Sequence, residues 1–306
     1  MTTATAALLQ DFAEANGMTA KPEAVRRNIA VVRALCKAAN ITTVEELTAG
    51  KVEGFLLAEH RNGKSAHTIH NYHGAISRFC GYLTRKGVLS ENVAHGIPLP
   101  AIEERPPIYL TEQEIDLALR IARRDHIFCE VVLALYTGLR MTELRLLEWK
   151  DVNLRWRYLI VRKSKSRRPR KVWLSRGAIE ALKEQQGKTG QFPHVFPGGR
   201  PGGTINGRGA WARRGPRGHE WWTSALEGIQ GRIEKFQQLP KQTCGRGWHL
   251  FRHTFASRAV QAGVSLYKVS QWLGHRNMTT TQRYAHLQTS FDDDIERIGK
   301  GNDDEC

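Results

Sequence analysis

Apolar residues recur at helical spacing through the first third of the chain, with basic residues between them. Residues 25–39 alternate apolar positions with Arg26, Arg27 and Arg33, and residues 65–85 repeat the pattern. Because residues three and four apart share one face of a helix, both stretches predict amphipathic helices. In the second stretch the apolar face consists of Ile69, Tyr72, Ile76, Phe79 and Tyr82, and the polar side carries His67, His70, Asn71 and Arg78.

Two threonines carry the signal of a helix start. Thr43 is followed three residues later by Glu46, and Thr111 by Glu114, the spacing at which each side chain can bond the other's backbone N–H. Residues 1–95 contain no strand pattern, so we expect a small helical bundle there. Helical spacing continues over residues 115–122, 127–136, 248–263 and 266–273.

A basic turn interrupts the helical pattern in the middle of the chain. Residues 158–162 and 171–174 predict two short strands on either side of it, and seven of the ten residues 162–171 are Arg or Lys. Residues 199–218 hold seven Gly and five Arg, which predicts a flexible basic loop. The fold class expected is therefore mainly α with a small β-sheet (α+β).

A proline-rich segment divides the chain. Proline has no backbone N–H and disfavours helix in the residue before it, so we interpret residues 98–109 as a linker. The predicted organisation is a helical domain over residues 1–97, a second domain over 110–290 and an acidic tail over 291–306. The prolines are Pro98, Pro100, Pro106 and Pro107.

The charge is strongly asymmetric. The formal net charge is +16, and residues 291–306 carry seven acids and two bases, which leaves about +21 on residues 1–290. Such a surplus favours a polyanionic partner, since each Lys or Arg placed on a phosphate releases counterions. A soluble protein with a solvated basic surface fits the charge equally well.

The cysteines and the hydropathy narrow the setting. The five cysteines are scattered without a CxxC pair, which indicates reduced thiols rather than disulfides or a zinc site. The N-terminal segment has no signal-peptide pattern, and no apolar run approaches the ~20 residues of a membrane span. We expect a cytoplasmic protein with no membrane partner.

Cleavage of a phosphodiester by a side chain requires a cationic clamp, a proton donor and a nucleophile. Several segments of the chain supply candidates for these groups. Arg140 and Glu143 are three residues apart, at the spacing where a carboxylate steadies an arginine. His249, Arg252 and His253 share one helix face by their spacing. His275 follows Gly274, a plausible helix C-cap, and Tyr284 comes nine residues later.

These segments resemble the motifs of the tyrosine recombinase (phage integrase) family. Residues 137–144 (TGLRMTEL), 249–256 (HLFRHTFA) and 273–286 (LGHRNMTTTQRYAH) match its three boxes in order and spacing. Residues 65–71 and 87–94 are similar to parts of its helical core-binding domain. The resemblance thus covers roughly residues 20–290, and implies two domains that form a C-shaped clamp around DNA.

The resemblance also implies a division of roles: a clamp on the scissile phosphate, hydrogen bonds or proton movement at its oxygens, a proton donor to the leaving 5′ oxygen, and a tyrosine that forms a 3′-phosphotyrosine. Lys165 fits the register of the proton donor, and Lys163 competes with it. No metal and no cofactor is implied. The roles fall on Arg140 and Arg252 (clamp), His249 and His275 (oxygens), Lys165 (donor), Glu143 and His253 (support) and Tyr284 (nucleophile); further DNA-binding candidates are Arg26, Arg27, His67, Asn71, Arg78, Lys163, Arg167, Arg168 and Arg170.

Double-stranded DNA with a specific recombination site is the implied partner. Family members act as tetramers on two sites through a Holliday junction, sometimes with accessory proteins, which would place this chain at the nucleoid. Absence of an arm-binding domain favours a simpler recombinase of the Xer or Cre type, or a mobile-element integrase. A relaxing type IB topoisomerase and a catalytically silent DNA-binding regulator are the alternatives.

Three departures from the family pattern stand out. Leu250 replaces an Asp common in the second box, and Trp173 replaces a Pro near the end of the second strand. The segment 196–249 is longer than the corresponding segment of the family. We expect this insert to contact phosphate, to stack on bases, to serve subunit contacts or to be a tolerated surface insertion. It is rich in Gly, Arg and Trp, and the tryptophans are Trp211, Trp221 and Trp222.

Overall fold

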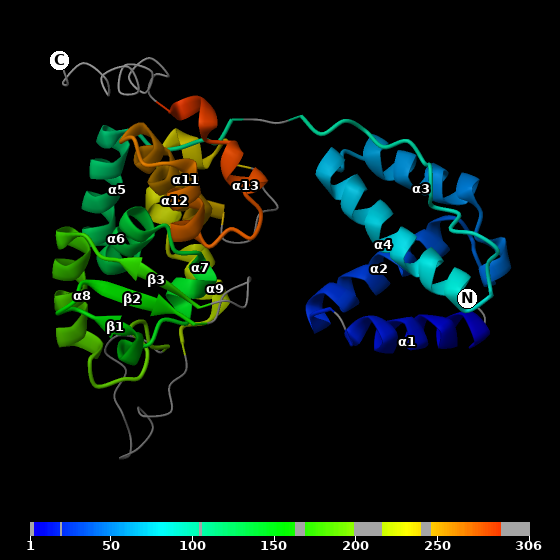
Figure 1. Ribbon diagram of the computed structural model, residues 1–306, viewed down its shortest axis with the longest axis horizontal. Helices are drawn as coiled ribbons and strands as arrows, with labels where there is room; N and C mark the ends of the chain where they lie inside the picture. Colours follow the sequence, from blue (N-terminus) through cyan, green and yellow to red (C-terminus); the bar gives the residue numbers. More distant parts are fainter. Residues whose placement is uncertain are drawn as a thin grey trace, which may run out of the picture. The chain divides into compact units, whose positions relative to one another are not determined.

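The computed structural model describes the chain as two compact units, Met1–Arg105 and Pro106–Cys306 (Figure 1). Their boundary falls inside the segment 98–109 that the prolines mark as a linker. The basic turn with Lys163, Lys165, Arg167 and Arg168, most of the loop 199–218 and the acidic tail lie outside the described residues. Those described are 3–18, 20–103, 106–162, 169–198, 216–239 and 246–288.

The first unit is the expected helical bundle (blue to cyan in Figure 1). Its core contains Val32, Leu35, Ile76 and Leu83, each under 1% exposed. Burial of this apolar surface is what holds the helices together, since short isolated helices are marginal in water. The helices are α1 (Thr3–Gly17), α2 (Pro22–Ala38), α3 (Ala49–Arg61) and α4 (Ala66–Arg85).

Helix α4 follows its sequence pattern closely. Ser65 caps it by accepting a hydrogen bond from the Thr68 backbone N–H, as a residue of this type does at an N-cap. Four of the five apolar positions are buried, and the fifth, Tyr72, is half-buried and stacks on Phe55 at 6.1 Å between ring centroids. The amphipathic helix predicted here is confirmed.

The helix start predicted at Thr43 is wrong. Residues Val44–Glu46 form a single 3-10 turn (η1), and Thr43 makes no side-chain cap. Glu46 instead accepts hydrogen bonds from the backbone N–H and the hydroxyl of Thr42, at 2.9 and 2.8 Å. The glutamate thus bonds the residue before Thr43, and no α-helix begins here. Helix α3 begins at Ala49 and is capped by Thr48.

The second unit combines helices with one small antiparallel sheet. The strand order is β1-β2-β3, with Val152 paired to Leu159 and Leu159 to Val172. Both predicted strands are present; β1 is only two residues long and had no sequence signal. The mainly helical α+β class is confirmed. The strands are β1 (Val152–Asn153), β2 (Tyr158–Val161) and β3 (Arg170–Trp173).

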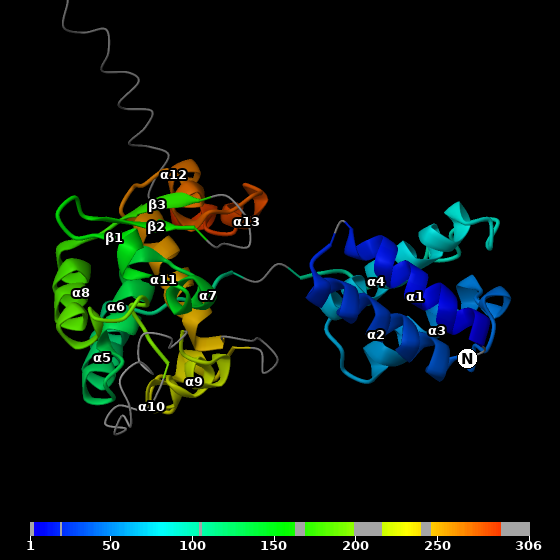
Figure 2. The ribbon, with the colours of Figure 1, turned by 90° about the horizontal axis from the view of Figure 1, so that it is seen from below.

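Helix α6 occupies the centre of this unit and packs on α5, α8 and α11. Val131, Leu133 and Ala134 of α6 are completely buried, which is why its sequence is apolar on every side. Helix α12 lies next to β3 and α11 (Figure 2). The main helices are α5 (Glu112–Arg124), α6 (Phe128–Thr137), α7 (Met141–Arg145), α8 (Arg176–Thr189), α11 (Arg246–Gln261), α12 (Leu266–Leu273) and α13 (Thr279–Gln282), with the 3-10 turns η2 (Trp149–Asp151) and η4 (Ala285–Leu287).

The helix start predicted at Thr111 is confirmed. Its hydroxyl accepts a hydrogen bond from the Glu114 backbone N–H at 3.3 Å, and the Thr111 backbone N–H donates to Glu114 Oε2 at 2.7 Å. Helix α5 therefore begins with the reciprocal cap that the spacing indicated.

The described part of the long insert folds onto the core. Trp222 is completely buried and packs edge-on against Phe196 and Trp248, at 5.6 and 4.9 Å between centroids. The Trp248 indole N–H donates to the Trp222 carbonyl at 2.6 Å. Trp222 therefore cannot stack on a base, which was one of the expectations for this insert. The elements here are α9 (His219–Ser224), α10 (Glu227–Gln230) and η3 (Glu234–Phe236).

Candidate active site

The candidate site begins at the sharp turn between α6 and α7. Gly138 ends α6 in the left-handed conformation, with φ +63°. A Cβ at this position would lie 2.5 Å from a ring carbon of Phe255 and 2.8 Å from a methyl of Leu273. Only glycine meets both requirements without strain, and the turn places the next residues at the start of α7.

Glu143 accepts two hydrogen bonds from Arg140 at the start of α7. The Arg140 backbone N–H donates to Glu143 Oε2 at 2.9 Å, and its Nη1 donates to Oε1 at 3.0 Å. The Glu143 side chain is 1% exposed and that of Arg140 is 19% exposed. The expected pairing of the two is thus present, with the arginine reaching solvent.

Arg170 completes this network from strand β3. Its two Nη groups donate to the two oxygens of Glu143 at 3.0 and 2.8 Å, and Nε donates to the Trp272 carbonyl at 2.9 Å. Burial alone would raise the pKa of Glu143, but the hydrogen bonds and charges of Arg170 and Arg140 hold that pKa below its usual range. Each nitrogen of the Arg170 guanidinium is engaged within the protein, which favours a bracing role over the DNA contact expected from its sequence position.

Arg252 lies beneath the same surface. It is 5% exposed, and its Nη1 and Nη2 donate to the carbonyls of Gly138 and Leu273, both at 2.6 Å. Arg140 also reaches the Leu273 carbonyl, at 3.4 Å, so two guanidinium groups meet at one backbone oxygen. Burial and then the charge of Arg140 lower the pKa of Arg252 to about 9, which still leaves it protonated at neutral pH.

His275 stands directly after α12. Gly274 ends that helix with φ +64°, and the His275 ring then bonds the buried Thr281 hydroxyl through Nδ1 at 2.8 Å. Burial, followed by the charges of Arg252 and Arg140, lowers the pKa of His275 to about 3. The imidazole is therefore neutral at pH 7, with Nε2 as its second hydrogen-bonding atom.

Tyr284 closes the group. It is 2% exposed and its ring packs in an apolar cluster with Ala256, Val260, Val269 and Leu273. Its hydroxyl lies 2.5 Å from Nδ1 of His253. Burial raises the pKa of Tyr284 to about 12, although the nearby Arg283 and Arg252 act in the opposite direction.

The fold thus gathers most of the sequence candidates of the second unit. Residues far apart in the chain meet around the end of α12, and His249 lies one turn before His253 on α11, near enough to lower its pKa. Sequence reasoning missed Thr281 and the Leu273 carbonyl; the threonine run 279–281 was a weak signal for the first, and a backbone acceptor has none. The residues gathered are Arg140, Glu143, Arg170, His249, Arg252, His253, His275 and Tyr284.

The candidates of the first unit are exposed residues of two helices. Arg26 and Arg27 are exposed on α2, and His67, Asn71 and Arg78 are exposed on α4. Positions 67, 71 and 78 fall within about 40° of one another around a helix of 3.6 residues per turn, so they form one stripe. Arg78 is held there by a hydrogen bond from its Nη2 to Asn28 Oδ1 at 3.2 Å.

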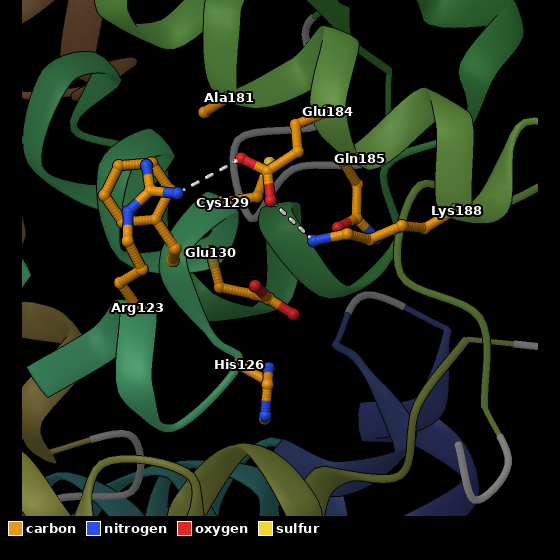
Figure 3. A pocket seen from close by; sticks show the side chains of 9 residues that line it. Arg123, His126, Cys129, Glu130, Ala181, Glu184, Gln185 and Lys188 are labelled. Carbon is orange, nitrogen blue, oxygen red and sulfur yellow. Dashed lines mark hydrogen bonds and ion pairs between the residues drawn. The ribbon is translucent and has the colours of Figure 1, made fainter. Parts of the chain in front are cut away.

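A separate cavity of about 60 Å³ lies between α5, α6 and α8 (Figure 3). Glu184 bridges Arg123 and Lys188 at its mouth, at 3.5 and 2.7 Å. Glu130 is buried at its floor and is paired with Arg217 at 2.6 Å. None of the candidate site residues lines the cavity, and both of its glutamates are already in ion pairs.

Two features are absent from the part of the chain that the structure describes. Within it, no group of three or more His, Cys, Asp or Glu side chains is arranged to hold a metal ion. No described helix has the length and hydropathy to cross a membrane.

The chain resembles known proteins over most of its length. Residues 109–290 match the model of the phage integrase family. Tyrosine recombinase XerC of Xylella fastidiosa (strain 9a5c) is 30% identical over 285 residues, which cover 90% of this chain and 89% of that protein. Tyrosine recombinase XerC of Pseudomonas syringae pv. syringae (strain B728a) is 28% identical over 284 residues, covering 87% and 84%.

Two solved structures share the fold. A λ integrase fragment, solved as a dimer bound to a COC′ core site, has a TM-score of 0.68 at 17% identity and covers 92% of this chain and 97% of its own. The Tn1549 transposon integrase in complex with transposon right end DNA has a TM-score of 0.68 at 19% identity, covering 95% and 99%. At these identities the likeness establishes a common fold.

Proposed function

This chain belongs to the phage integrase family, and from that premise we propose that it is a site-specific DNA recombinase in which Tyr284 forms a transient bond to a DNA phosphate. One observation carries the proposal: Arg140 and Arg252 converge on the Leu273 carbonyl, and Leu273 packs in the cluster that holds Tyr284. Two guanidinium groups and the tyrosine thus share Leu273 as a neighbour, which supports their assignment as clamp and nucleophile.

The clamp suits the transition state of phosphoryl transfer. Charge gathers on the non-bridging oxygens as the phosphate becomes pentavalent, and arginine offers N–H groups in a planar fork that matches them. Arg252 is fixed by two backbone carbonyls and Arg140 by Glu143. Little reorganisation is then needed when the phosphate binds, which is the source of electrostatic catalysis in such sites.

The proposed reaction balances without an external energy source. The Tyr284 oxygen gives up its hydroxyl proton to solvent and forms a bond to phosphorus as the bond from phosphorus to the 5′ oxygen breaks. One proton leaves the tyrosine and one is gained by the 5′ oxygen, so the proton count is unchanged. The leaving 5′ oxygen takes a proton from Lys165, with Lys163 as the competing donor; this assignment comes from the family motif, and both lysines lie outside the described residues. The phosphotyrosine ester conserves the bond energy, so a 5′ hydroxyl of another strand can reverse the step without ATP or a cofactor.

The two remaining histidines are assigned to the phosphate oxygens. Nδ1 of His275 is engaged with Thr281, which leaves Nε2 to bond an oxygen. Its lowered pKa keeps the ring neutral, so Nε2 carries a proton when Nδ1 accepts from the threonine hydroxyl. His249 shares the α11 face with Arg252, and we assign it the same phosphate.

The first unit supplies the DNA-binding surface in this proposal. The exposed stripe His67, Asn71 and Arg78 on α4 combines a phosphate-binding cation with side chains able to read base edges. Arg26 and Arg27 add positive charge on α2. Recombination between two sites requires four copies of the chain and a Holliday junction, as the family resemblance implies, with a nucleoid location and accessory proteins as further expectations.

The decisive experiment is covalent trapping on DNA. A plasmid library with randomised sites, and then a nicked substrate built from the trapped sequence, would be incubated with wild type and Tyr284→Phe in EDTA. We expect a protein–DNA adduct from wild type alone. Sequencing of the trapped ends would then give the recombination site.

Other outcomes separate the alternative functions. Adducts spread over all sequences, with plasmid relaxation and no recombinant product, would indicate a type IB topoisomerase. Tight and specific binding with no adduct on any DNA would indicate a silent regulator. An adduct that persists in Tyr284→Phe would remove Tyr284 from the proposal.

A further inference from the structure

The hydroxyl of Tyr284 contacts the imidazole of His253. Its Oη lies 2.5 Å from Nδ1 of His253, and the two ring centroids are 6.0 Å apart with a tilt of 46°. This contact joins α11 to the segment after α13, through residues 31 positions apart. His253 follows Arg252 directly, so the arginine of the clamp and the partner of the tyrosine are adjacent in sequence.

The environment keeps both partners of this hydrogen bond neutral. His253 is largely buried, and four positive or potentially positive groups act on it: Arg283 beside Tyr284, His249 and Arg252 on its own helix, and His275 after α12. Burial first, and then these neighbours, lower the pKa of His253 to about 3. In the tautomer with its proton on Nε2, the neutral imidazole accepts at Nδ1. Burial keeps the tyrosine protonated by raising its pKa to about 12, so in this tautomer the hydroxyl is the donor.

Two separate constraints therefore hold the tyrosine. Its ring is packed among Ala256, Val260, Val269 and Leu273, which sets the position of the oxygen and leaves the hydroxyl only its rotation about the Cζ–Oη bond. The hydrogen bond to His253 removes that last freedom, because the hydroxyl proton must point at Nδ1. The lone pairs of Oη are then directed elsewhere and are available to an incoming phosphorus atom.

We propose that His253 is a positioning residue for the nucleophile, which aims the Tyr284 oxygen at the scissile phosphate by accepting its hydroxyl hydrogen bond. This inference rests on the proposed function, since it assumes that Tyr284 attacks. It assigns His253 a role different from those of His249 and His275, which serve the phosphate. A hydroxyl that is correctly placed but free to rotate would cleave more slowly while DNA bound equally well.

Two substitutions separate this role from simple packing. In His253→Asn the amide oxygen lies close to the position of Nδ1 and can accept the same hydrogen bond. In His253→Phe a ring of similar size fills the space but offers no acceptor. A packing role predicts that Phe is the milder change, and a positioning role predicts that Asn is.

The first measurement is the single-turnover rate of adduct formation on the nicked substrate, together with the dissociation constant for that DNA. We expect His253→Phe to cleave about 10–100-fold more slowly, within the range that misplacement of a reacting group produces, with an unchanged dissociation constant. His253→Asn should recover most of the rate. Cleavage by His253→Phe at the wild-type rate, or no recovery in His253→Asn, would overturn the proposal.

The second measurement needs no DNA. With ¹³Cζ-labelled tyrosine, the Tyr284 resonance is assigned by its loss in Tyr284→Phe, and its chemical shift reports the hydrogen bond of the phenol. It should move in His253→Phe and stay near wild type in His253→Asn; an unmoved resonance in His253→Phe would show that the contact is absent. A third outcome is that wild type forms no adduct while the resonance behaves as expected. The hydrogen bond between His253 and Tyr284 is then present, but the proposed function fails, and the positioning role fails with it.

Discussion

The carboxylate of Glu143 accepts a hydrogen bond from each Nη group of Arg170, at 3.0 and 2.8 Å, although the two residues are 27 positions apart. Arg170 Nε reaches the Trp272 carbonyl in turn. Strand β3 is thereby tied to the start of α7 and to the end of α12. Since Arg140 shares the same carboxylate, the brace also fixes one half of the proposed phosphate clamp.

Removal of Arg170 should destabilise the second unit and slow cleavage. The Arg170 and Glu143 side chains are 10% and 1% exposed, and breaking a buried pair leaves a charge without its partner. We expect Arg170→Met to cost about 3 kcal/mol in the free energy of unfolding, at the low end of the range for such pairs because Arg140 still binds Glu143. All eight tryptophans lie in the second unit, so their fluorescence during urea unfolding reports this unit alone.

A matched control is available for this substitution. Arg176 pairs with Glu180 at 3.2 Å, but the two side chains are 92% and 65% exposed. Arg176→Met should change the stability by no more than about 0.5 kcal/mol. Equal effects of the two substitutions would show that the brace contributes no more than a surface ion pair.

Gly274→Ala should disturb the same brace from the other side. The residue has φ +64°, and a Cβ would lie 2.9 Å from Nη1 and 3.0 Å from Cδ of Arg170. Arg170 cannot simply move away, because Glu143 and the Trp272 carbonyl hold it. We expect a loss of about 2–4 kcal/mol, from the left-handed backbone and the steric overlap together, and slower adduct formation.

Gly263→Ala separates these two causes. Gly263 has φ +79°, but no atom lies within 4 Å of the position that a Cβ would occupy, so only the backbone strain of about 1–2 kcal/mol applies. Urea unfolding followed by tryptophan fluorescence measures both variants. A Gly274→Ala loss no larger than that of Gly263→Ala would mean that Arg170 yields to the added methyl group without cost.

The stability of the second unit should fall as the pH drops from 7 to 5.5, in part through His253. The unfolded histidine takes up a proton near pH 6.5, whereas the folded one does so only near its pKa of about 3. Its folded pKa is lowered, so the unfolded state binds more protons in this window and gains stability. His253 alone should account for a loss of about 1 kcal/mol between these two pH values.

His253→Asn tests this assignment. The variant should lose about 1 kcal/mol less than wild type over the same interval, as measured by urea unfolding at both pH values. Glu143 does not confuse the comparison, since its pKa is held below its usual range and its contribution is lost only at lower pH. Equal losses in wild type and variant would place the responsible proton elsewhere.

The sequence predicted much of the site because the motif spacings are helical spacings. Arg252 and His253 emerge from one face of α11, and Gly274 ends α12 as its position indicated. The role of Arg170 was not predictable, because nothing local to β3 indicates that its side chain reaches back 27 positions to Glu143. Its basic neighbours in the turn made a DNA contact the natural expectation.

Two other outcomes have equally physical reasons. Thr43 has the right residue types for a helix cap, but Thr42 captures the glutamate instead, a choice between adjacent hydroxyls that composition does not decide. Trp222 lies in a segment rich in Gly and Arg, yet it fills a space beside Phe196 and Trp248. A local hydrogen bond decided the first outcome, and tertiary packing decided the second.

The stripe on α4 leads to a prediction about DNA binding that distinguishes two kinds of contact. Arg78 is exposed and steadied by Asn28, a geometry suited to a phosphate. Arg78→Ala should weaken binding to every duplex alike and reduce the slope of log affinity against log salt by about 1. Asn71→Ala should weaken binding by about 1–3 kcal/mol on the trapped sequence and little on random DNA, since an asparagine amide reads base edges.

Fluorescence anisotropy between about 50 and 200 mM salt, the range in which phosphate contacts dominate affinity, measures both variants. Lys51→Ala is the matched control: it removes the same charge from α3, where Lys51 faces Glu46 at 3.8 Å, outside the stripe. Its salt slope should stay at the wild-type value. If Lys51→Ala and Arg78→Ala reduce the slope equally, the first unit attracts DNA through its net charge, and α4 has no privileged place in the interface.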